Sequence, residues 1–223
     1  MAEKTLLLTN AHIISPDCEL WGAAGLIAGD RIKRIYAAGD ALPGADAVTD
    51  LQGKMLMPGF IDVHTHGRSG YEFTDGDLDH LKTMCKDKLS EGVTSWLPTT
   101  LTLDNAALTK ALENAAAYTA SGAAGAKVPG VHLEGPYINE KCLGAQNPAY
   151  VRLPDIEEVR QLNKVCPVKK VSFAVEVEKG TEFASELLSE GITPSCVHSQ
   201  ATYKAFTAAY DHGLRNLSHF CNQ

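Results

Sequence analysis

The pattern of apolar and polar positions changes near residue 58. Residues 4–57 carry short apolar runs between turn-forming residues, such as "TLLLTNAHII" and "GLIAGDRIKRIYAAG", and no window there has a convincing helical stripe. Gly29 and Asp30 lie between two alternating runs, which indicates a tight hairpin. The pattern therefore predicts a small β-sandwich module as the first domain, residues 1–57.

From Pro58 onwards, strand-like apolar runs alternate with helical segments. The runs expected to form strands cover residues 59–66, 94–100, 128–135, 170–176, 193–199 and 216–222. Several intervening segments have apolar residues at i, i+3 and i+4, and several end on glycine, as helices often do. Buried strands that alternate with helices predict a parallel sheet covered by helices.

Two α/β architectures fit this alternation, an open doubly wound sheet and a closed (β/α)8 barrel. No G-x-G-x-x-G motif follows the first strand, and polar, metal-competent residues gather at the C-terminal ends of the strands, where a barrel has its active site. We therefore predict a TIM-type (β/α)8 barrel over residues 58–223. Only six strands are visible, whereas a barrel needs eight and about 250 residues, so the sequence is either a fragment or part of a barrel completed by another chain.

Composition narrows the classes of function. The chain has 223 residues, 44% of them hydrophobic and 21% charged, as in an ordinary globular protein. A net charge of −7 and scattered basic residues argue against a nucleic-acid or membrane partner. No segment approaches the roughly 18 consecutive apolar residues of a membrane span. The six cysteines form no C-x-x-C pair, which is typical of reduced thiols and predicts a cytoplasmic protein.

Histidines and one glutamate at the strand ends are the candidate metal ligands. His64 and His66 are two residues apart at the end of the first strand, so both side chains face the same way and can reach one ion. Glu134 ends the third strand, and the Gly-Pro that follows bends the chain and presents the carboxylate at the rim. His198 and His219 end the fifth and sixth strands. Such a nitrogen and carboxylate set suits Zn²⁺ or another first-row divalent ion, with one position left for water.

Other polar residues receive weaker assignments. His132 shares the parity of Glu134 but lies one layer deeper, so we expect it to be a core or supporting residue. Glu176 ends the fourth strand and either supports the site or has no part in it. The remaining histidines, expected to play no role, are His12, His80 and His212.

Several motifs together resemble one enzyme family. "PGFIDVHTHG", "GVTSWLPTT", "GVHLEGPYIN", "GAQNPAYV", "VHSQAT" and "LSHFCNQ" resemble, in this order, the N-acetylglucosamine-6-phosphate deacetylases of the amidohydrolase superfamily. The first motif is common to many amidohydrolases, whereas "HLEGP" followed by "GAQNP" is the most selective. Many relatives bridge two ions with a carbamylated lysine, and the deacetylases use the glutamate of HLEGP instead.

The resemblance implies a residue set for the site. Glu134, His198 and His219 would hold the principal ion, and His64 and His66 would form a second site with Glu134 as the bridge. One or two ions per chain are implied, Zn²⁺ first, with Fe²⁺, Mn²⁺ or Co²⁺ as alternatives. The residues that would contact the substrate are Gln146, which stands where other members often carry a histidine, Asn147 and Asn222.

The implied reaction converts N-acetylglucosamine 6-phosphate to glucosamine 6-phosphate and acetate, in a homodimer. The aspartate that serves the family as general base would lie beyond Gln223, so we expect no catalytic acid or base in these residues and little or no activity from this chain alone. Two alternatives remain. One is a dihydroorotase-like amidohydrolase that acts on cyclic amides, and the other is an inactive metal-binding fragment.

Overall fold

The computed structural model describes residues 3–220. The chain divides into two compact units, Met1–Gly59 and Phe60–Gln223, and each is described by itself.

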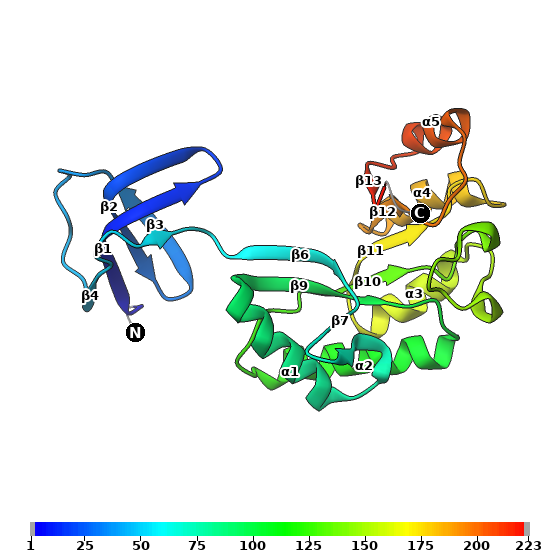
Figure 1. Ribbon diagram of the computed structural model, residues 1–223, viewed down its shortest axis with the longest axis horizontal. Helices are drawn as coiled ribbons and strands as arrows, with labels where there is room; N and C mark the ends of the chain where they lie inside the picture. The colour runs from blue at the N-terminus through cyan, green and yellow to red at the C-terminus, as the bar shows by residue number, and fades with distance from the viewer. Residues whose placement is uncertain (1–2, 221–223) are drawn as a thin grey trace. The chain divides into compact units, whose positions relative to one another are not determined.

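The first unit is a single β-sheet (Figure 1). Its strands are β1 (Thr5–Ser15), β2 (Cys18–Ala28), β3 (Arg31–Tyr36), β4 (Ala47–Asp50) and β5 (Met55–Leu56). The order is β3-β2-β1-β4, with β5 also paired to β1. The antiparallel β2 and β3 are joined by Gly29 and Asp30, which confirms the hairpin, and Gly29 has the positive φ of 58° that such a turn requires. The described residues of this unit supply one sheet, so the sandwich stays a prediction.

The second unit contains a six-stranded parallel sheet. Its strands are β6 (Phe60–Thr65), β9 (Val93–Thr100), β10 (Val131–Glu134), β11 (Val168–Phe173), β12 (Thr193–Cys196) and β13 (Asn216–Leu217). The helices between them are α1 (Leu78–Lys88), α2 (Asn105–Ser121), α3 (Ile156–Val165), α4 (Gly180–Ser189) and α5 (Tyr203–Asp211). All six predicted strands are present, with boundaries that differ by a few residues.

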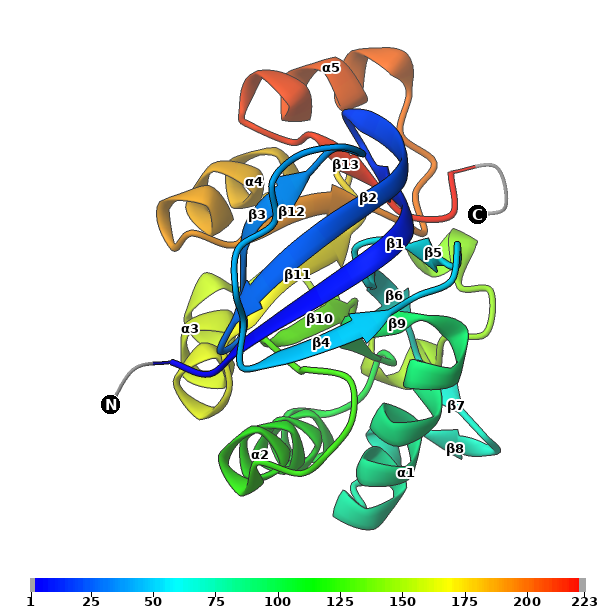
Figure 2. The same cartoon turned by 90° about the vertical axis from the view of Figure 1, so that its left-hand side faces the viewer.

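The strands lie side by side in the order in which they occur along the chain, β6-β9-β10-β11-β12-β13. Right-handed crossovers between such neighbours place every helix on the same face of the sheet, and Figure 2 shows the helices around the outside of the strands. A doubly wound sheet would reverse its order at a switch point, and the strands of residues 60–220 do not. The mixed α/β fold is therefore confirmed. Closure into an eight-stranded barrel stays a prediction, because β6 and β13 are edges of the described sheet.

Short elements that the sequence pattern did not predict lie near the ends of the strands. They are the hairpin of β7 (Gly67–Arg68) and β8 (Tyr71–Glu72) and the 3₁₀ turns η1 (Phe73–Asp75), η2 (Leu89–Glu91), η3 (Glu140–Cys142) and η4 (Pro148–Tyr150).

The main apolar core lies between the sheet and its helices. Trp96 from β9, Leu112 from α2, Phe173 from β11 and Leu187 from α4 are all fully buried there. Burial of such a side chain stabilises the fold by about 1.5–3 kcal/mol. This packing holds the sheet and thereby fixes the positions of its C-terminal strand ends. Among the described residues, no helix has both the length and the apolar character needed to cross a membrane.

Candidate metal centre

The carboxylate of Glu134 is the centre of the candidate site. The residue ends β10, it is 1% exposed, and its backbone pairs with Ser172 of β11. The next residue, Gly135, has a positive φ of 71°, and a Cβ there would lie 2.2 Å from Oγ1 of Thr102. Only glycine therefore lets the chain turn directly after the glutamate.

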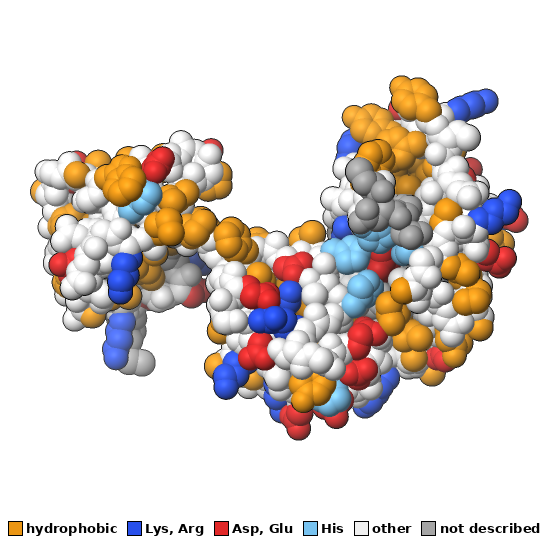
Figure 3. All heavy atoms as spheres, in the orientation of Figure 1, with side chains coloured by type: hydrophobic (Ala, Val, Ile, Leu, Met, Phe, Trp, Pro, Cys, Tyr) orange, Lys and Arg blue, Asp and Glu red, His pale blue; other side chains and the backbone are white. Residues whose placement is uncertain are grey.

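Four imidazoles surround this carboxylate, two at each oxygen. At Oε1, Nε2 of His219 lies at 2.7 Å and Nε2 of His198 at 3.5 Å. At Oε2, Nε2 of His66 lies at 2.8 Å and Nε2 of His64 at 3.4 Å. The ligand atoms of each trio, one oxygen and two nitrogens, lie within 4.8 Å of one another. The structure thus brings together all five residues that the sequence predicted as ligands, and Figure 3 shows histidines gathered around an acidic side chain on this face.

His198 and His219 reach the carboxylate from unusual backbone conformations. They follow β12 and β13 with φ values of 44° and 29°, in the left-handed region. Such a conformation costs a residue other than glycine on the order of 1–3 kcal/mol and is found mostly at functional sites. It also explains why the strand predicted over residues 193–199 ends at Cys196.

Hydrogen bonds fix the tautomers of two of the imidazoles. Nδ1 of His198 lies 2.6 Å from the carbonyl oxygen of Cys142, and Nδ1 of His66 lies 3.2 Å from that of Thr99. A carbonyl oxygen only accepts, so each Nδ1 carries the hydrogen, and Nε2 of the neutral ring presents a lone pair to Glu134. Two acceptors face each other stably only with a proton or a cation between them. This donor set fits a divalent ion, and an Nδ1–H bonded to a carbonyl is the usual support of a metal-binding histidine.

The charges agree with a site built for a cation. Burial alone would raise the pKa of Glu134, but its contacts with His198, His64 and His66 outweigh burial and hold that pKa far below its usual range. Burial would likewise lower the pKa of His66, and the hydrogen bond and the charge of Glu134 raise it instead. Glu134 is therefore a buried anion that requires positive charge beside it.

His132 lies beneath this cluster, outside both trios. It is fully buried, with Nε2 2.7 Å from Oγ of Ser172 and Nδ1 3.3 Å from Oγ1 of Thr99. Burial, followed by the charges of Lys170 and His64, lowers the pKa of His132 well below the ordinary value, so the ring is neutral. A supporting position in the core matches the expectation from its parity.

Glu176 holds the segment directly after His198 and the loop residue Asn139, which bonds His198. Its carboxylate accepts hydrogen bonds from Nδ2 of Asn139 at 2.7 Å, Oγ of Ser199 at 2.5 Å and the amide of Gln200 at 2.6 Å. The backbone amide of Asn139 in turn donates to the carbonyl oxygen of His198 at 3.1 Å. Of the two alternatives left open by the sequence, these contacts favour a supporting role.

The three predicted substrate contacts lie in different situations. Gln146 is 6% exposed and hydrogen-bonds the backbone of Thr102 and the carboxylate of Glu134. Asn147 is exposed, and its side chain caps η4 by accepting from the amide of Ala149 at 3.0 Å. Asn222 lies outside the described residues.

The remaining histidines belong to neither trio. His12 stacks on Trp21 and bonds Glu19, His80 stacks on Tyr71 and bonds Asp75, and His212 bonds the carbonyl of Ala208.

A partly buried ion pair that the sequence pattern did not indicate supports the first strand. Lys88 is 4% exposed, and its Nζ donates to Oδ2 of Asp62 at 2.7 Å and to Oγ1 of Thr65 at 3.2 Å. Oδ1 of Asp62 accepts from the amide of His64 at 3.0 Å. Burial would raise the pKa of Asp62, but Lys88 and Thr65 lower it. An acid inside the apolar run "FIDVH" was the signal available in the sequence.

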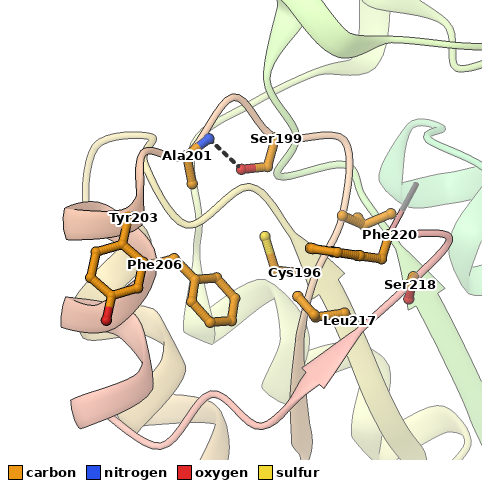
Figure 4. Close-up of a pocket in the computed structure, with 9 residues that line it drawn as sticks. Cys196, Ser199, Ala201, Tyr203, Phe206, Leu217, Ser218 and Phe220 are labelled. Atoms are coloured by element: carbon orange, nitrogen blue, oxygen red, sulfur yellow. Dashed lines mark hydrogen bonds between the residues drawn. The ribbon is translucent and has the colours of Figure 1, made fainter. Parts of the chain in front are cut away.

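An apolar cavity of about 400 Å³ lies between β12, β13 and α5 (Figure 4). Its lining includes Cys196, Phe206 and Leu217, and none of the five candidate ligands. The candidate metal ligands are therefore in the carboxylate cluster, whereas the cavity offers mainly apolar contacts.

Curated proteins with similar sequences are sugar-phosphate deacetylases. No protein-family model matches the chain. It is 34% identical over 190 residues to N-acetylgalactosamine-6-phosphate deacetylase of Escherichia coli O157:H7, covering 84% of this chain and 50% of that protein. It is 29% identical over 227 residues to N-acetylglucosamine-6-phosphate deacetylase of Bacillus subtilis, covering 100% of this chain and 57% of that protein.

Solved structures give the same result. The N-acetylglucosamine-6-phosphate deacetylase of Pasteurella multocida superposes with a TM-score of 0.87 at 28% identity, over 98% of this chain and 57% of that one. A mutant N-acetyl-D-glucosamine-6-phosphate deacetylase of Mycobacterium smegmatis, in complex with N-acetyl-D-glucosamine 6-phosphate, superposes with a TM-score of 0.86 at 26% identity. The superposition covers 98% of this chain and 56% of that one. The chain is therefore a homologue of the N-acetylglucosamine-6-phosphate deacetylase family that spans about half the length of the curated relatives it matches.

Proposed function

We propose that Glu134 and the four histidines bind one or two divalent ions, Zn²⁺ first and Fe²⁺, Mn²⁺ or Co²⁺ as alternatives. The observation that carries this proposal is the division of the carboxylate, with Oε1 facing His198 and His219 and Oε2 facing His64 and His66. Each trio offers two imidazole nitrogens and one carboxylate oxygen, the donor set of many catalytic zinc sites.

The reaction that this site serves is hydrolysis of the acetamide of an amino-sugar phosphate, with N-acetylglucosamine 6-phosphate as substrate. When bound, a divalent ion supplies a Lewis acid for the amide carbonyl and lowers the pKa of a water. The residues of this chain hold the charge and geometry of the site: Glu134 would bridge the ions, His198 and His66 are fixed in tautomer, and Glu176 supports the segment after His198. The relatives named above support this substrate class, and "HLEGP" favours it over cyclic amides.

We also retain the domain division at residues 1–57 and 58–223, the homodimer and the cytoplasmic location as proposals. Five free cysteines among the described residues fit a reducing compartment. The proton-transferring aspartate that the resemblance implies falls beyond Gln223. We therefore propose that the 223-residue chain by itself binds metal and hydrolyses substrate slowly or not at all.

Metal analysis combined with an acetate-release assay tests these proposals. The chain is purified, its metal content is measured, and acetate is assayed with the 6-phosphates of N-acetylglucosamine and N-acetylgalactosamine. The deacetylase of Bacillus subtilis is the positive control, and the Glu134→Gln chain is the negative control. We expect bound metal in the wild type only, with little or no acetate from either sugar. Absence of metal would refute the site, and rapid acetate release would refute the need for a residue beyond Gln223.

A further inference from the structure

Both polar ends of the Gln146 side chain form hydrogen bonds inside the protein. It is 6% exposed, and its Oε1 accepts from the amide of Thr102 at 2.7 Å. A backbone amide only donates, so this contact assigns the oxygen of the glutamine and directs the NH₂ group the other way. There, Nε2 donates to Oε2 of Glu134 at the long distance of 3.4 Å.

This hydrogen bond reaches only one oxygen of the bridging carboxylate. Oε2 faces His64 and His66, whereas for Oε1, which faces His198 and His219, the described residues show no hydrogen bond with Gln146. Rotation of the carboxylate about its last bond would exchange or tilt the two oxygens. A donor anchored to the β9–α2 loop through Thr102 opposes that rotation.

We propose that Gln146 is a positioning residue that holds Oε2 of Glu134 toward His64 and His66 and thereby sets the affinity of that ion position. This inference rests on the proposed metal centre. It differs from the substrate contact that the resemblance implied, because both polar ends of the amide are already engaged inside the protein. A residue that supports a metal ligand in this way changes metal affinity about 10–100-fold when it is removed.

The test is a Zn²⁺ titration of the full 223-residue chain in competition with a chromophoric chelator. His66→Ala and His219→Ala identify which binding step belongs to which side of Glu134, and Glu134→Gln gives the background from thiols. Gln146→Met removes both hydrogen bonds at nearly constant size. We expect the step that His66→Ala abolishes to weaken about 10–100-fold, with the other step nearly unchanged. A merely structural role of Gln146 would weaken both steps alike.

Gln146→Glu is the second variant, because it keeps an acceptor for the amide of Thr102. It replaces the donor that faces Oε2 with a negative charge, so we expect tighter binding at the same step and again little change at the other.

Three results would overturn the proposal: equal shifts of both steps, no shift in either variant, or a wild-type chain that binds one ion only, on the His198 side. A wild-type chain that binds no ion at Glu134 would overturn the metal centre itself, and with it any positioning by Gln146.

Discussion

A single buried carboxylate governs the chemistry of this site. An ionised glutamate that is 1% exposed costs several kcal/mol unless positive charge and hydrogen bonds compensate. Here the groups at the two oxygens are the imidazoles of four histidines and, at the longer distance of 3.4 Å, the side-chain amide of Gln146. A cation between Glu134 and its histidines would satisfy the acceptors on both sides at once, which is why metal affinity is the sensitive measure of this residue.

We expect Glu134→Gln to lower Zn²⁺ affinity at both steps of the titration by at least about 100-fold, beyond the effect typical of residues that merely support a ligand. Glutamine keeps the size of the side chain but removes the negative charge and one acceptor oxygen. Glu140→Gln is the matched control, since Glu140 is an exposed acid in η3 and should leave both steps unchanged. If Glu134→Gln retained either step at full affinity, that ion would not depend on the carboxylate.

At the scale of residues, the sequence was informative where spacing determines direction. H-x-H at the end of a strand and glutamate before Gly-Pro placed side chains on one face, and the structure brings them together. The left-handed backbone of His198 leaves no mark in composition. Asp62 had a local signal, an acid inside an apolar run, but its partner Lys88 had none, because their contact depends on how α1 packs against β6.

At the scale of elements, periodicity was sufficient for the strands and helices of the second unit but not for their ends. Capping residues, and not the period, set the ends of helix α2. Asp104 caps its start and Gly122, in the left-handed conformation, ends it, and both residue types are recognisable in the sequence. The β7–β8 hairpin and the 3₁₀ turns span two or three residues each, too few to show a period.

The turn after β10 gives a prediction at this scale. Gly135→Ala places a Cβ 2.2 Å from Oγ1 of Thr102 at a φ of 71°, so Thr102 or the end of β10 must move. We expect a loss of about 1–3 kcal/mol in the free energy of unfolding, measured in urea, together with weaker Zn²⁺ binding as Glu134 shifts. Gly122→Ala is the control, with a φ of 63° and no atom within 4 Å of the new Cβ. This variant should lose stability only because alanine disfavours the positive φ, and it should bind Zn²⁺ as the wild type does.

The loops above β9 and β10 give a prediction about pH. Arg152 donates to both carboxylate oxygens of Glu158, at 2.9 and 2.6 Å, and to the carbonyls of Leu103 and Tyr150. Burial would raise the pKa of Glu158, but Arg152, Asn105 and Tyr137 lower it. The pair therefore stabilises the fold at pH values above the ordinary glutamate pKa of about 4.3. This contribution disappears as the pH falls through the lowered pKa of Glu158.

We accordingly expect Arg152→Met to lose about 1–3 kcal/mol of unfolding free energy at pH 7. The difference from wild type should shrink steadily as the pH is lowered below 4. Urea unfolding at a series of pH values measures both effects. Arg160→Met, which breaks the surface ion pairs of Arg160 with Glu157 on α3 and with Glu190 at the end of α4, should have little effect at any pH. A difference for Arg152→Met that stayed constant with pH would mean that packing, and not the ion pair, provides the stability.

At the scale of the whole molecule, the sequence predicted the sheet but could not establish its closure. The order of the strands follows from short right-handed crossovers between neighbours. Closure requires a partner for both β6 and β13, and the chain matches only about half of each relative. The same holds for the sandwich, since the first unit contributes one sheet.

The candidate ligands come from the ends of β6, β10, β12 and β13. Bound ions would therefore connect strands across the whole described sheet, and the first unit would supply no ligand.

Each unit carries one tryptophan, Trp21 in the first and the fully buried Trp96 in the second. We expect Zn²⁺ at 100 times its dissociation constant to raise the unfolding free energy of the second unit by about 2.7 kcal/mol. The unfolding transition followed by Trp96 fluorescence, called the Trp96 transition below, reports this change. Trp21→Phe and Trp96→Phe chains, unfolded in urea with Zn²⁺ or with a chelator, report the two units separately by fluorescence. A Trp96 transition that Zn²⁺ does not shift would contradict a metal centre built from these strands. A shift that appears at Trp96 and is absent at Trp21 would locate the binding energy in the second unit.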